Sequence, residues 1–435
     1  MDESKIYKTI LELTERLILK RKSQEKFIPG VTRIGYAGRV YDQYEVMNAV
    51  RASLDFWLTE GPYARLLEAN FRNYYKSKSF ILVNSGSSAN LLMVSSLISK
   101  NVKNSLKKGD EVITPATTFP TTLTPIIQCG LRPVFVDIEI DTLNINPNKI
   151  ESAITKNTKA LFIPHTLGNP CDMELIMKIV NKYNLFLLED SCDALGGTYD
   201  GQLVGTFGGM ASHSFYPAHQ MTMGEGGGII INSPQFVKIV RSLRDWGRDC
   251  WCEPGKNNTC RKRFDGSWGG DLPIGYDHKY VYSELGYNLK ITDLQAAIGL
   301  AQFDKLPSFV EKRQKNFLQL YEGLKQFQEY VLLPRWSTKA NPSWFGFPIT
   351  LAKGLDRSKF TIFLESKGIE TRMIFAGNIL RQPGFTHIDK RISGSLKQTD
   401  SAMERSFFIG VYPGITNEMI NYMIDQIGKF LRTKI

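Results

Sequence analysis

Four of the six cysteines in this chain have a spacing that indicates a metal or iron–sulfur site. Cys192, Cys250, Cys252 and Cys260 are separated by 57, 1 and 7 residues. Thiolates bind both zinc and iron–sulfur clusters, so the ligand type alone leaves both open. Structural zinc sites usually present ligand pairs roughly two to four residues apart. The one-residue gap and the remote Cys192 therefore favour an iron–sulfur centre.

His219 is the second candidate for chemistry. It ends the run Ser-His-Ser-Phe-Tyr-Pro-Ala-His at residues 212–219 and follows Ser214 by five residues. An imidazole has an unperturbed pKa of about 6.5, so it can take and return a proton near neutral pH. Tyr216 and Thr222 are the neighbours that we expect to orient the ring.

Two further motifs are typical of a ligand-binding edge. Residues 84–90 read Asn-Ser-Gly-Ser-Ser-Ala-Asn, follow a predicted strand and open a predicted helix. Free backbone N–H groups and the positive end of a helix bind phosphate at such a position, although the same residues also serve as plain helix caps. The acidic run Glu-Asp-Ser-Cys-Asp at 189–193 ends another predicted strand. Ligands bind at the carboxyl ends of parallel strands.

These motifs resemble those of the DegT-like sugar aminotransferases, a family that uses pyridoxal phosphate and has the fold-type I architecture. In that family a Ser-Phe-x-x-x-Lys run carries the lysine that binds the cofactor. Here Ser214 begins the run, and His219 stands where the lysine would be. Because an imidazole cannot form that covalent bond, the resemblance implies non-covalent binding of pyridoxamine phosphate, with His219 restricted to proton transfer.

The resemblance also implies the remaining cofactor contacts. Its phosphate-binding residues match Gly86, Ser87, Ser88 and Ser214. Its stacking aromatic matches Phe119, its carboxylate at the pyridine nitrogen matches Asp190, and its histidine near the ring matches His165. Structural roles stay open for Phe119 and His165. Asp193 stands where many members have glutamine, and we expect it near the phenolic oxygen. Asn288 matches an asparagine that the neighbouring subunit delivers, which implies a homodimer.

Within this family the chain is most similar to the iron–sulfur-dependent CDP-4-keto-6-deoxyglucose 3-dehydrases. The similarity lies in the cysteine spacing and in the motifs at 214–219, 245–250 and 275–280. It implies a 2Fe-2S cluster that passes electrons from a separate NADH-dependent flavin and iron–sulfur reductase. The implied reaction removes the carbon 3 hydroxyl of a CDP-4-keto-6-deoxyhexose during dideoxysugar and lipopolysaccharide O-antigen biosynthesis.

Further residues are predicted to contact the reductase or the substrate. Arg261, Lys262 and Arg263 directly follow a cysteine of the set and are predicted to help dock an acidic reductase. Arg372, Asn378 and Arg381 are predicted to contact the substrate, with a solvated surface as the open alternative.

Three other functions remain as alternatives. A cluster-free 3-dehydratase that regenerates its amine from glutamate would also use histidine, but it would not explain the four cysteines. An inactive scaffold with structural zinc would explain the cysteines and the missing lysine, but not the retained acids, phosphate motif and aromatic. An ordinary aminotransferase is disfavoured by His219.

Composition limits the remaining possibilities. The 435 residues, 42% hydrophobic and 22% charged, are ordinary for a globular enzyme. No signal peptide or membrane span is recognisable, so we expect a cytoplasmic protein that does not bind membranes, with thiols rather than disulfides. The net charge of +11 admits nucleic-acid binding, but the basic residues are scattered and no nucleic-acid-binding motif occurs. We therefore expect no nucleic-acid partner.

The pattern of apolar residues predicts an α/β fold, with a mostly parallel sheet flanked by helices and a smaller α+β domain. The predicted strands are 80–83, 111–114, 134–136, 160–163, 185–188, 228–231 and 345–350, and the predicted helices are 46–60, 65–76, 291–303, 310–327 and 417–432. We expect an N-terminal segment at 1–40, a large cofactor-binding domain at 41–305 and a small domain at 306–435, with a hinge at 305–307. The cysteine-bearing insertion at 245–285 is predicted to be irregular and functional.

Overall fold

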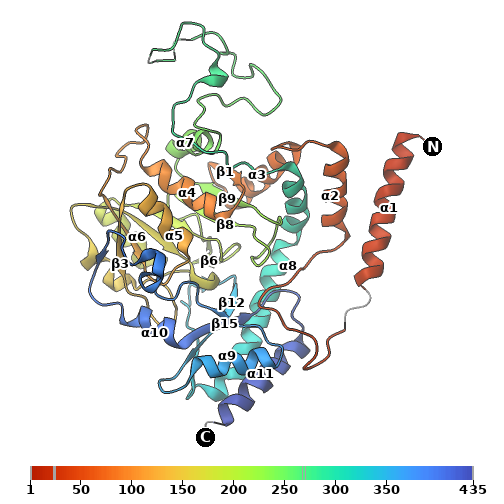
Figure 1. The fold of residues 1–435 in the computed structure, drawn as a ribbon, viewed down its shortest axis with the longest axis vertical. Coiled ribbons are helices and arrows are strands. Elements are labelled where there is room, and N and C mark those ends of the chain that lie inside the picture. Colours follow the sequence, from red (N-terminus) through yellow and green to blue (C-terminus); the bar gives the residue numbers. More distant parts are fainter. Residues whose placement is uncertain (1, 23–25, 267, 270, 434–435) are drawn as a thin grey trace.

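The computed structural model describes residues 2–22, 26–266, 268–269 and 271–433. Its centre is an eight-stranded sheet with the order β1-β9-β8-β5-β4-β2-β3-β14 (Figure 1). The strands are β1 (Ser79–Val83), β2 (Glu111–Pro115), β3 (Arg132–Val136), β4 (Thr158–Pro164), β5 (Phe186–Asp190), β8 (Met210–Ser214), β9 (Gly227–Ile231) and β14 (Arg391–Ile392). Only β9 runs against its two neighbours, and the other adjacent pairs are parallel. The mostly parallel sheet that the sequence predicted is confirmed.

Helices cover both faces of this sheet. One face packs against α4 (Gly86–Leu97), α5 (Pro120–Gln128) and α7 (Gln235–Arg244), and the other against α3 (Pro62–Tyr75), α6 (Met173–Tyr183) and the first half of α8 (Asp293–Leu324). Within β1, Ile81 and Val83 point to the first face, and Phe80 and Leu82 point to the second. Because neighbouring side chains of a strand point to opposite faces, a strand buried on both sides is apolar throughout.

A smaller sheet, antiparallel throughout, builds the second hydrophobic core. Its order is β10-β12-β15-β13, and the strands are β10 (Val331–Leu332), β12 (Gly346–Leu351), β13 (Arg372–Met373) and β15 (Ser406–Gly410). The helices of this part are α9 (Arg357–Ser366), α10 (Lys397–Arg405) and α11 (Asn417–Arg432). A third sheet joins β6 (Thr198–Tyr199) and β7 (Gln202–Leu203) to β11 (Ala340–Asn341). The α+β character predicted for the C-terminal part is thus present.

The predicted hinge at residues 305–307 is wrong. The single helix α8 runs through Pro307. Lys305 reaches Glu45 of α2 (Gln43–Asp55) at 2.6 Å, Leu306 is buried in the large core, and Phe317 is buried in the small one. Proline removes only one backbone donor, and packing on both sides keeps the helix continuous. Because both parts share this helix, the domain boundary at 305/306 remains a prediction.

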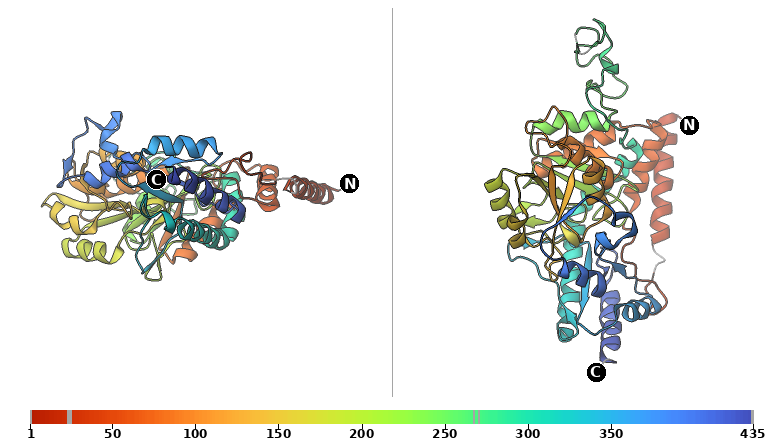
Figure 2. Two further views of the ribbon diagram at one scale, coloured as in Figure 1. Left: turned by 90° about the horizontal axis from the view of Figure 1, so that it is seen from below. Right: turned by 60° about the vertical axis from the view of Figure 1, so that its left-hand side comes forward.

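The N-terminal residues and the cysteine-bearing segment both lie at the margin of the molecule. Helix α1 (Glu3–Lys22) stands beside α2, within the segment that the sequence set apart at 1–40 (Figure 1). The described part of residues 245–285 extends away from the sheet in Figure 1 and in the right-hand view of Figure 2. Within their described part, the one helical turn is a 3₁₀ turn at His278–Tyr280, as expected for an irregular insertion. Among the described residues, no helix is long and apolar enough to cross a membrane.

Candidate active site

A cavity of about 410 Å³ lies where the carboxyl ends of the large sheet meet the small domain. Most of the predicted cofactor residues line it: Gly86, Ser87, Phe119, His165, Asp190, Asp193 and Ser214. The predicted catalytic residue His219 and the predicted cluster ligand Cys192 line it as well. Tyr36, Phe345, Phe375 and Phe408 supply apolar walls, and Arg372 adds a cation. A concave, mostly apolar cavity with a few convergent polar groups is typical of a small-molecule site.

The first turn of α4 forms one end of the cavity. Ser85 caps this helix, and its Oγ accepts a hydrogen bond from the backbone N–H of Ser88 at 3.0 Å. Gly86 is needed here, because a Cβ at this position would lie 2.6 Å from the Cβ of Ser214. Gly86 and Ser87 line the cavity, so the positive end of the helix is directed at it. Ser88 serves the cap and is not part of the lining. This end fits a phosphate group.

Asp190 lies at the end of β5 with its carboxylate fixed. Oδ2 accepts hydrogen bonds from Asn90 Nδ2 at 2.8 Å and Thr122 Oγ1 at 2.7 Å. Oδ1 accepts from Ser212 Oγ at 3.3 Å and from the backbone N–H of Cys192 at 3.3 Å. Across the cavity, Phe119 is half-exposed, with its ring edge-on to Phe375. A fixed carboxylate, a phosphate-binding turn and a free aromatic face together fit pyridoxal or pyridoxamine phosphate.

His219 lies on the cavity wall beside Asp193. Its Nδ1 is 3.5 Å from Asp193 Oδ1, and no hydrogen-bond partner for Nδ1 is found among the described residues. Burial and, to a smaller extent, the nearby Arg313 cation lower the pKa of His219 to about 3. Burial and the charge of Asp190 raise the pKa of Asp193 to about 8. At neutral pH the imidazole is therefore uncharged and free to accept a proton.

Arg313, in the middle of α8, holds the backbone around His219. Its guanidinium is buried and donates hydrogen bonds to the carbonyl groups of Ala218 at 3.3 Å and His219 at 2.9 Å. It also donates to the carbonyl groups of Trp344 and Phe345 of the small domain. Sequence analysis missed Arg313, and no motif could have found it, because its partners are backbone atoms distant in sequence.

The comparisons with known proteins agree with this geometry. The sequence profile described as the DegT/DnrJ/EryC1/StrS aminotransferase family matches residues 41–428. The chain belongs to this family.

Several named proteins are similar to this family member. The lipopolysaccharide biosynthesis protein RfbH of Salmonella typhimurium is 47% identical over 99% of both chains. The dTDP-4-dehydro-2,6-dideoxy-D-glucose 3-dehydratase of Saccharopolyspora spinosa is 47% identical over 95% of this chain and 89% of its own. The solved structure of the Escherichia coli GDP-4-keto-6-deoxy-D-mannose-3-dehydratase with bound hydrated PLP has a TM-score of 0.82 and 30% identity, covering 91% of this chain and 99% of that one. The predicted fold-type I architecture is confirmed.

Of the other contacts that the family resemblance predicted, the structure places only some at the cavity. His165 lines the cavity, but Nδ1 accepts from the backbone N–H of Cys171 at 3.1 Å and Nε2 faces Glu189 at 3.2 Å. Its polar atoms are thus occupied, and only the ring is available to a cofactor. Asn288 is exposed and does not line the cavity of its own chain. Of the two residues expected to orient His219, Tyr216 lies edge-on to its ring, whereas Thr222 donates to the carbonyl of Phe215 instead.

The three predicted substrate contacts do not lie together. Arg372 lines the cavity and stacks on Tyr36 at 4.1 Å. Asn378 is buried and caps a 3₁₀ turn while it donates to Asp400 Oδ1 at 2.6 Å. Arg381 pairs with the same carboxylate at 2.9 Å. Asp400 thus draws Asn378 and Arg381 away from the cavity, and the structure does not bring them to the site that Arg372 reaches.

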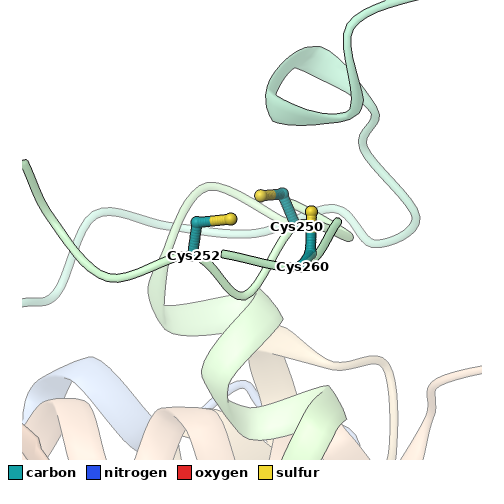
Figure 3. Close-up of side chains that lie close together, drawn as sticks. All are labelled: Cys250, Cys252 and Cys260. Atoms are coloured by element: carbon teal, nitrogen blue, oxygen red, sulfur yellow. The ribbon is translucent and has the colours of Figure 1, made fainter. Parts of the chain in front are cut away.

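The predicted set of four cysteines is not assembled in one chain. The Sγ atoms of Cys250, Cys252 and Cys260 all lie within 4.8 Å of one another and turn toward a common space (Figure 3). Cys192 is absent from this group and lines the cofactor cavity instead. The physical reason is that Cys192 directly follows β5 at the carboxyl edge of the sheet, whereas the other three belong to the protruding segment. Within one chain, three of the predicted ligands fit a metal centre and the fourth does not.

A histidine and an aromatic ring lie beside the three thiols. His278 is buried, with Nδ1 3.6 Å from Cys260 Sγ and Nε2 2.8 Å from Asp249 Oδ2. Trp268 stacks on the imidazole at 3.8 Å. Burial opposes ionisation of Cys252, but hydrogen bonds from Thr259 and from neighbouring backbone and thiols lower its pKa to about 7. Sequence analysis assigned no role to His278, although the sequence places it in the motif at 275–280.

One of the three residues predicted to dock a reductase has a partner within the chain. Arg263 forms an ion pair with Asp277 at 2.8 Å, which leaves it less available to an external acid. Arg261 and Lys262 are exposed on the same segment.

Proposed function

We propose that this chain removes the carbon 3 hydroxyl of a nucleotide-linked 4-keto-6-deoxyhexose with pyridoxamine phosphate as its cofactor. The observation that carries the proposal is the set of residues that line the cavity wall. His219 occupies it, and none of the described residues that line the cavity is a lysine. A histidine moves protons but does not hold the cofactor covalently, so dehydration rather than transfer of an amino group follows.

Each residue has a separate task in this proposal. Bound pyridoxamine phosphate supplies an amine that combines with the 4-keto group and a ring that withdraws electrons. The first turn of α4, Asp190 and Phe119 all line the cavity. The turn would hold the phosphate, Asp190 would keep the pyridine nitrogen protonated, and Phe119 would stack on the ring. The uncharged imidazole of His219 accepts the proton of the cofactor's methylene carbon. The same imidazole can return that proton to the hydroxyl that departs from carbon 3 as water.

The cysteines supply the second half of the proposal. Cys250, Cys252, Cys260 and Cys192 would hold a 2Fe-2S cluster, which would supply one-electron transfer from a separate NADH-dependent flavin and iron–sulfur reductase. Two electrons, two protons and hydrolysis that releases the cofactor amine would then give a 3,6-dideoxy-4-ketosugar for a surface polysaccharide. The convergence of three thiols supports this step, and so does the similarity to a Salmonella lipopolysaccharide biosynthesis protein. The enzyme is proposed to act in the cytoplasm as a homodimer.

Cytidine diphosphate is the proposed nucleotide, on the strength of the sequence motifs at 245–250 and 275–280. A similar protein is named for a dTDP-sugar, so the base has to be tested directly. CDP-, dTDP- and GDP-linked 4-keto-6-deoxyhexoses should be compared as substrates. We expect the highest kcat/KM for the CDP-sugar, and a higher value for another nucleotide would overturn this choice.

A second candidate is a cluster-free dehydratase that regenerates its amine from glutamate. The separation of Cys192 from the other cysteines favours it, and so does the similarity to the E. coli GDP-sugar 3-dehydratase. Anaerobic purification with assays of iron, sulfide and zinc discriminates between the two candidates. About two irons and two sulfides per chain support the cluster. Zinc without sulfide, together with turnover driven by glutamate alone, supports the second candidate.

The dehydration itself is tested without any reductant. The protein is loaded with pyridoxamine phosphate and incubated with the 4-ketosugar in water labelled with heavy oxygen. Reversible loss of the carbon 3 hydroxyl introduces label at carbon 3, which mass spectrometry of the recovered sugar detects. We expect label at carbon 3 only when the cofactor is present. Transfer of an amino group to carbon 4 without any label at carbon 3 would overturn the proposed function.

A further inference from the structure

Three thiols of the protruding segment form an incomplete ligand set. Cys250, Cys252 and Cys260 bring their sulfur atoms together (Figure 3), but a 2Fe-2S cluster needs four protein ligands. His278 does not complete the set in this conformation, because its ring nitrogens do not join the group in which all ligand atoms lie within 4.8 Å. Its Nδ1 lies 3.6 Å from Cys260 Sγ, and its Nε2 pairs with Asp249. A fourth ligand has to come from elsewhere.

Within one chain, Cys192 and the three thiols lie near opposite ends of strand β1. Cys250 and Cys252 line a cavity that Ser79 and Phe80, the first residues of β1, also line. Cys192 lies beside Gly86, which follows the other end of β1, since a Cβ on Gly86 would be 3.0 Å from its Sγ. At about 3.3 Å per residue, strand β1 separates the two places by on the order of 15 Å. A bond from iron or zinc to sulfur is only about 2.3 Å long.

The segment that bears the three thiols exposes large apolar side chains. Leu285 is 96% exposed, and Ile274 is 95% exposed. The segment touches the body where Gly255 approaches Trp57, and the neighbouring Phe56 is 72% exposed. An apolar surface of this extent is usually covered by another protein. A second copy of the chain is an occupant that offers both an apolar face of the same kind and an additional Cys192.

We propose that Cys192 of the partner subunit is the fourth ligand, so that the cluster spans the two chains of a homodimer. This inference rests on the cluster assigned under the proposed function. In a symmetric dimer, two such centres form, and each joins the three thiols of one chain to Cys192 of the other. Because Cys192 lines the cofactor cavity, each cluster then lies at the cavity of the subunit opposite to its own segment. The cluster thereby lies close to the cofactor of the partner subunit. Within one chain, no thiol of the segment reaches the cofactor.

Mixed dimers test the inference through metal content. Chains that carry Cys192→Ser and chains that carry Cys252→Ser receive different affinity tags, are co-expressed, and are purified through both tags. If the cluster spans the chains, the mixed dimer keeps one intact set: the three thiols of the Cys192→Ser chain with Cys192 of the Cys252→Ser chain. We expect about half the iron and sulfide of the wild-type dimer, with the wild-type electron paramagnetic resonance signal, and none in either homodimer.

The possible results distinguish failure of the proposed cluster from failure of the proposal that it spans two chains. Wild-type dimers that bind no iron or sulfide after anaerobic reconstitution overturn the cluster and this inference together. A wild-type cluster combined with an empty mixed dimer overturns only the inference, because the ligands then belong to one chain. A Cys192→Ser homodimer that keeps its cluster shows that Cys192 is not a ligand and also overturns it. Cys129→Ser, at a half-buried cysteine outside both sites, is the matched control, and cofactor absorbance verifies folding of each dimer.

Discussion

The cofactor cavity and the cysteine segment are built in different ways. The cavity groups stand at the ends of buried strands and first turns of helices, and Asp190 alone is held by four donors. The segment at 245–285 has one described 3₁₀ turn and extends away from the sheet. The cavity groups are thus preorganised on rigid elements, whereas the irregular segment would, under the proposed function, be ordered by a metal and a partner surface. We therefore expect that the two halves of the proposed reaction can be perturbed separately.

Replacing His219 should have the largest effect, and only on the cavity. His219→Asn removes the proton acceptor, so we expect oxygen exchange at carbon 3 to fall by about 10² to 10⁴ fold. Iron content should not change. The measurement is the labelling assay with pyridoxamine phosphate, and His387→Asn, at an exposed position, is the control. Exchange at the wild-type rate in His219→Asn would assign the proton transfer to another group.

Removing the support behind His219 should have the next largest effect. Arg313→Met leaves four backbone carbonyl groups without their buried donor, so we expect a loss of roughly 3 kcal/mol of unfolding free energy. We also expect the exchange rate at saturating substrate to fall about tenfold because the imidazole is less well positioned. Urea unfolding and the labelling assay well below the melting temperature measure both quantities. Arg313→Lys should recover part of the loss. An unchanged exchange rate in a destabilised Arg313→Met would restrict Arg313 to a structural role.

Replacing Arg372 should have a smaller effect, on substrate binding rather than on the chemical step. Arg372→Ala removes the one arginine among the described residues that line the cavity, and we expect KM for the nucleotide sugar to rise about tenfold with little change in kcat. Arg381→Ala is the matched control, because Arg381 pairs with Asp400 outside the cavity. Equal KM increases in the two variants would return Arg381 to the substrate site.

The last prediction concerns the stability of the large sheet under acid. Burial lowers the pKa of His213 to about 4, and its ring is fixed between Tyr75 and the carbonyl of Ser191. The unfolded chain binds a proton at this histidine below pH of about 6.5, whereas the folded chain does not until about pH 4. Stability should therefore fall as the pH is lowered through this window, by about 1.4 kcal/mol per pH unit. His219 acts in the same direction.

The variant His213→Asn isolates this contribution. Urea unfolding between pH 7 and pH 5 should show a pH dependence that is weaker by about one proton than in the wild type. An identical pH dependence in both proteins would mean that His213 is protonated in the folded state. Iron content should be insensitive to this variant, because His213 lies in β8.

The same contrast explains what the sequence could predict. The predicted strands appear because strands buried on both faces are continuous apolar runs, and the helix at 417–432 was predicted to the residue. Strand β8 was missed since Met-Ala-Ser-His-Ser is polar although it is fully buried. Helix α2 ends at Asp55, before the predicted residue 60, because Phe56 adopts a left-handed conformation. Such tertiary effects leave no periodic pattern in the sequence.

The candidate site was predictable where function resides in local motifs. Ser87, Asp190, Ser214 and His219 each lie in a short run, and all line one cavity. Arg313 was not predictable, because a buried arginine that binds backbone carbonyl groups has no sequence signature. The cysteine spacing correctly grouped three thiols but could not show that Cys192 lies elsewhere in the same chain.

The most direct test of the account is oxygen exchange at carbon 3 by the Cys252→Ser variant, with pyridoxamine phosphate bound and no reductant. If the two regions act separately, the cavity completes the dehydration without the cysteine segment. We then expect exchange at about the wild-type rate together with loss of iron and of the deoxygenated product. Loss of exchange in a folded variant that still binds the cofactor would contradict the account, since the two regions would then act as one catalytic unit.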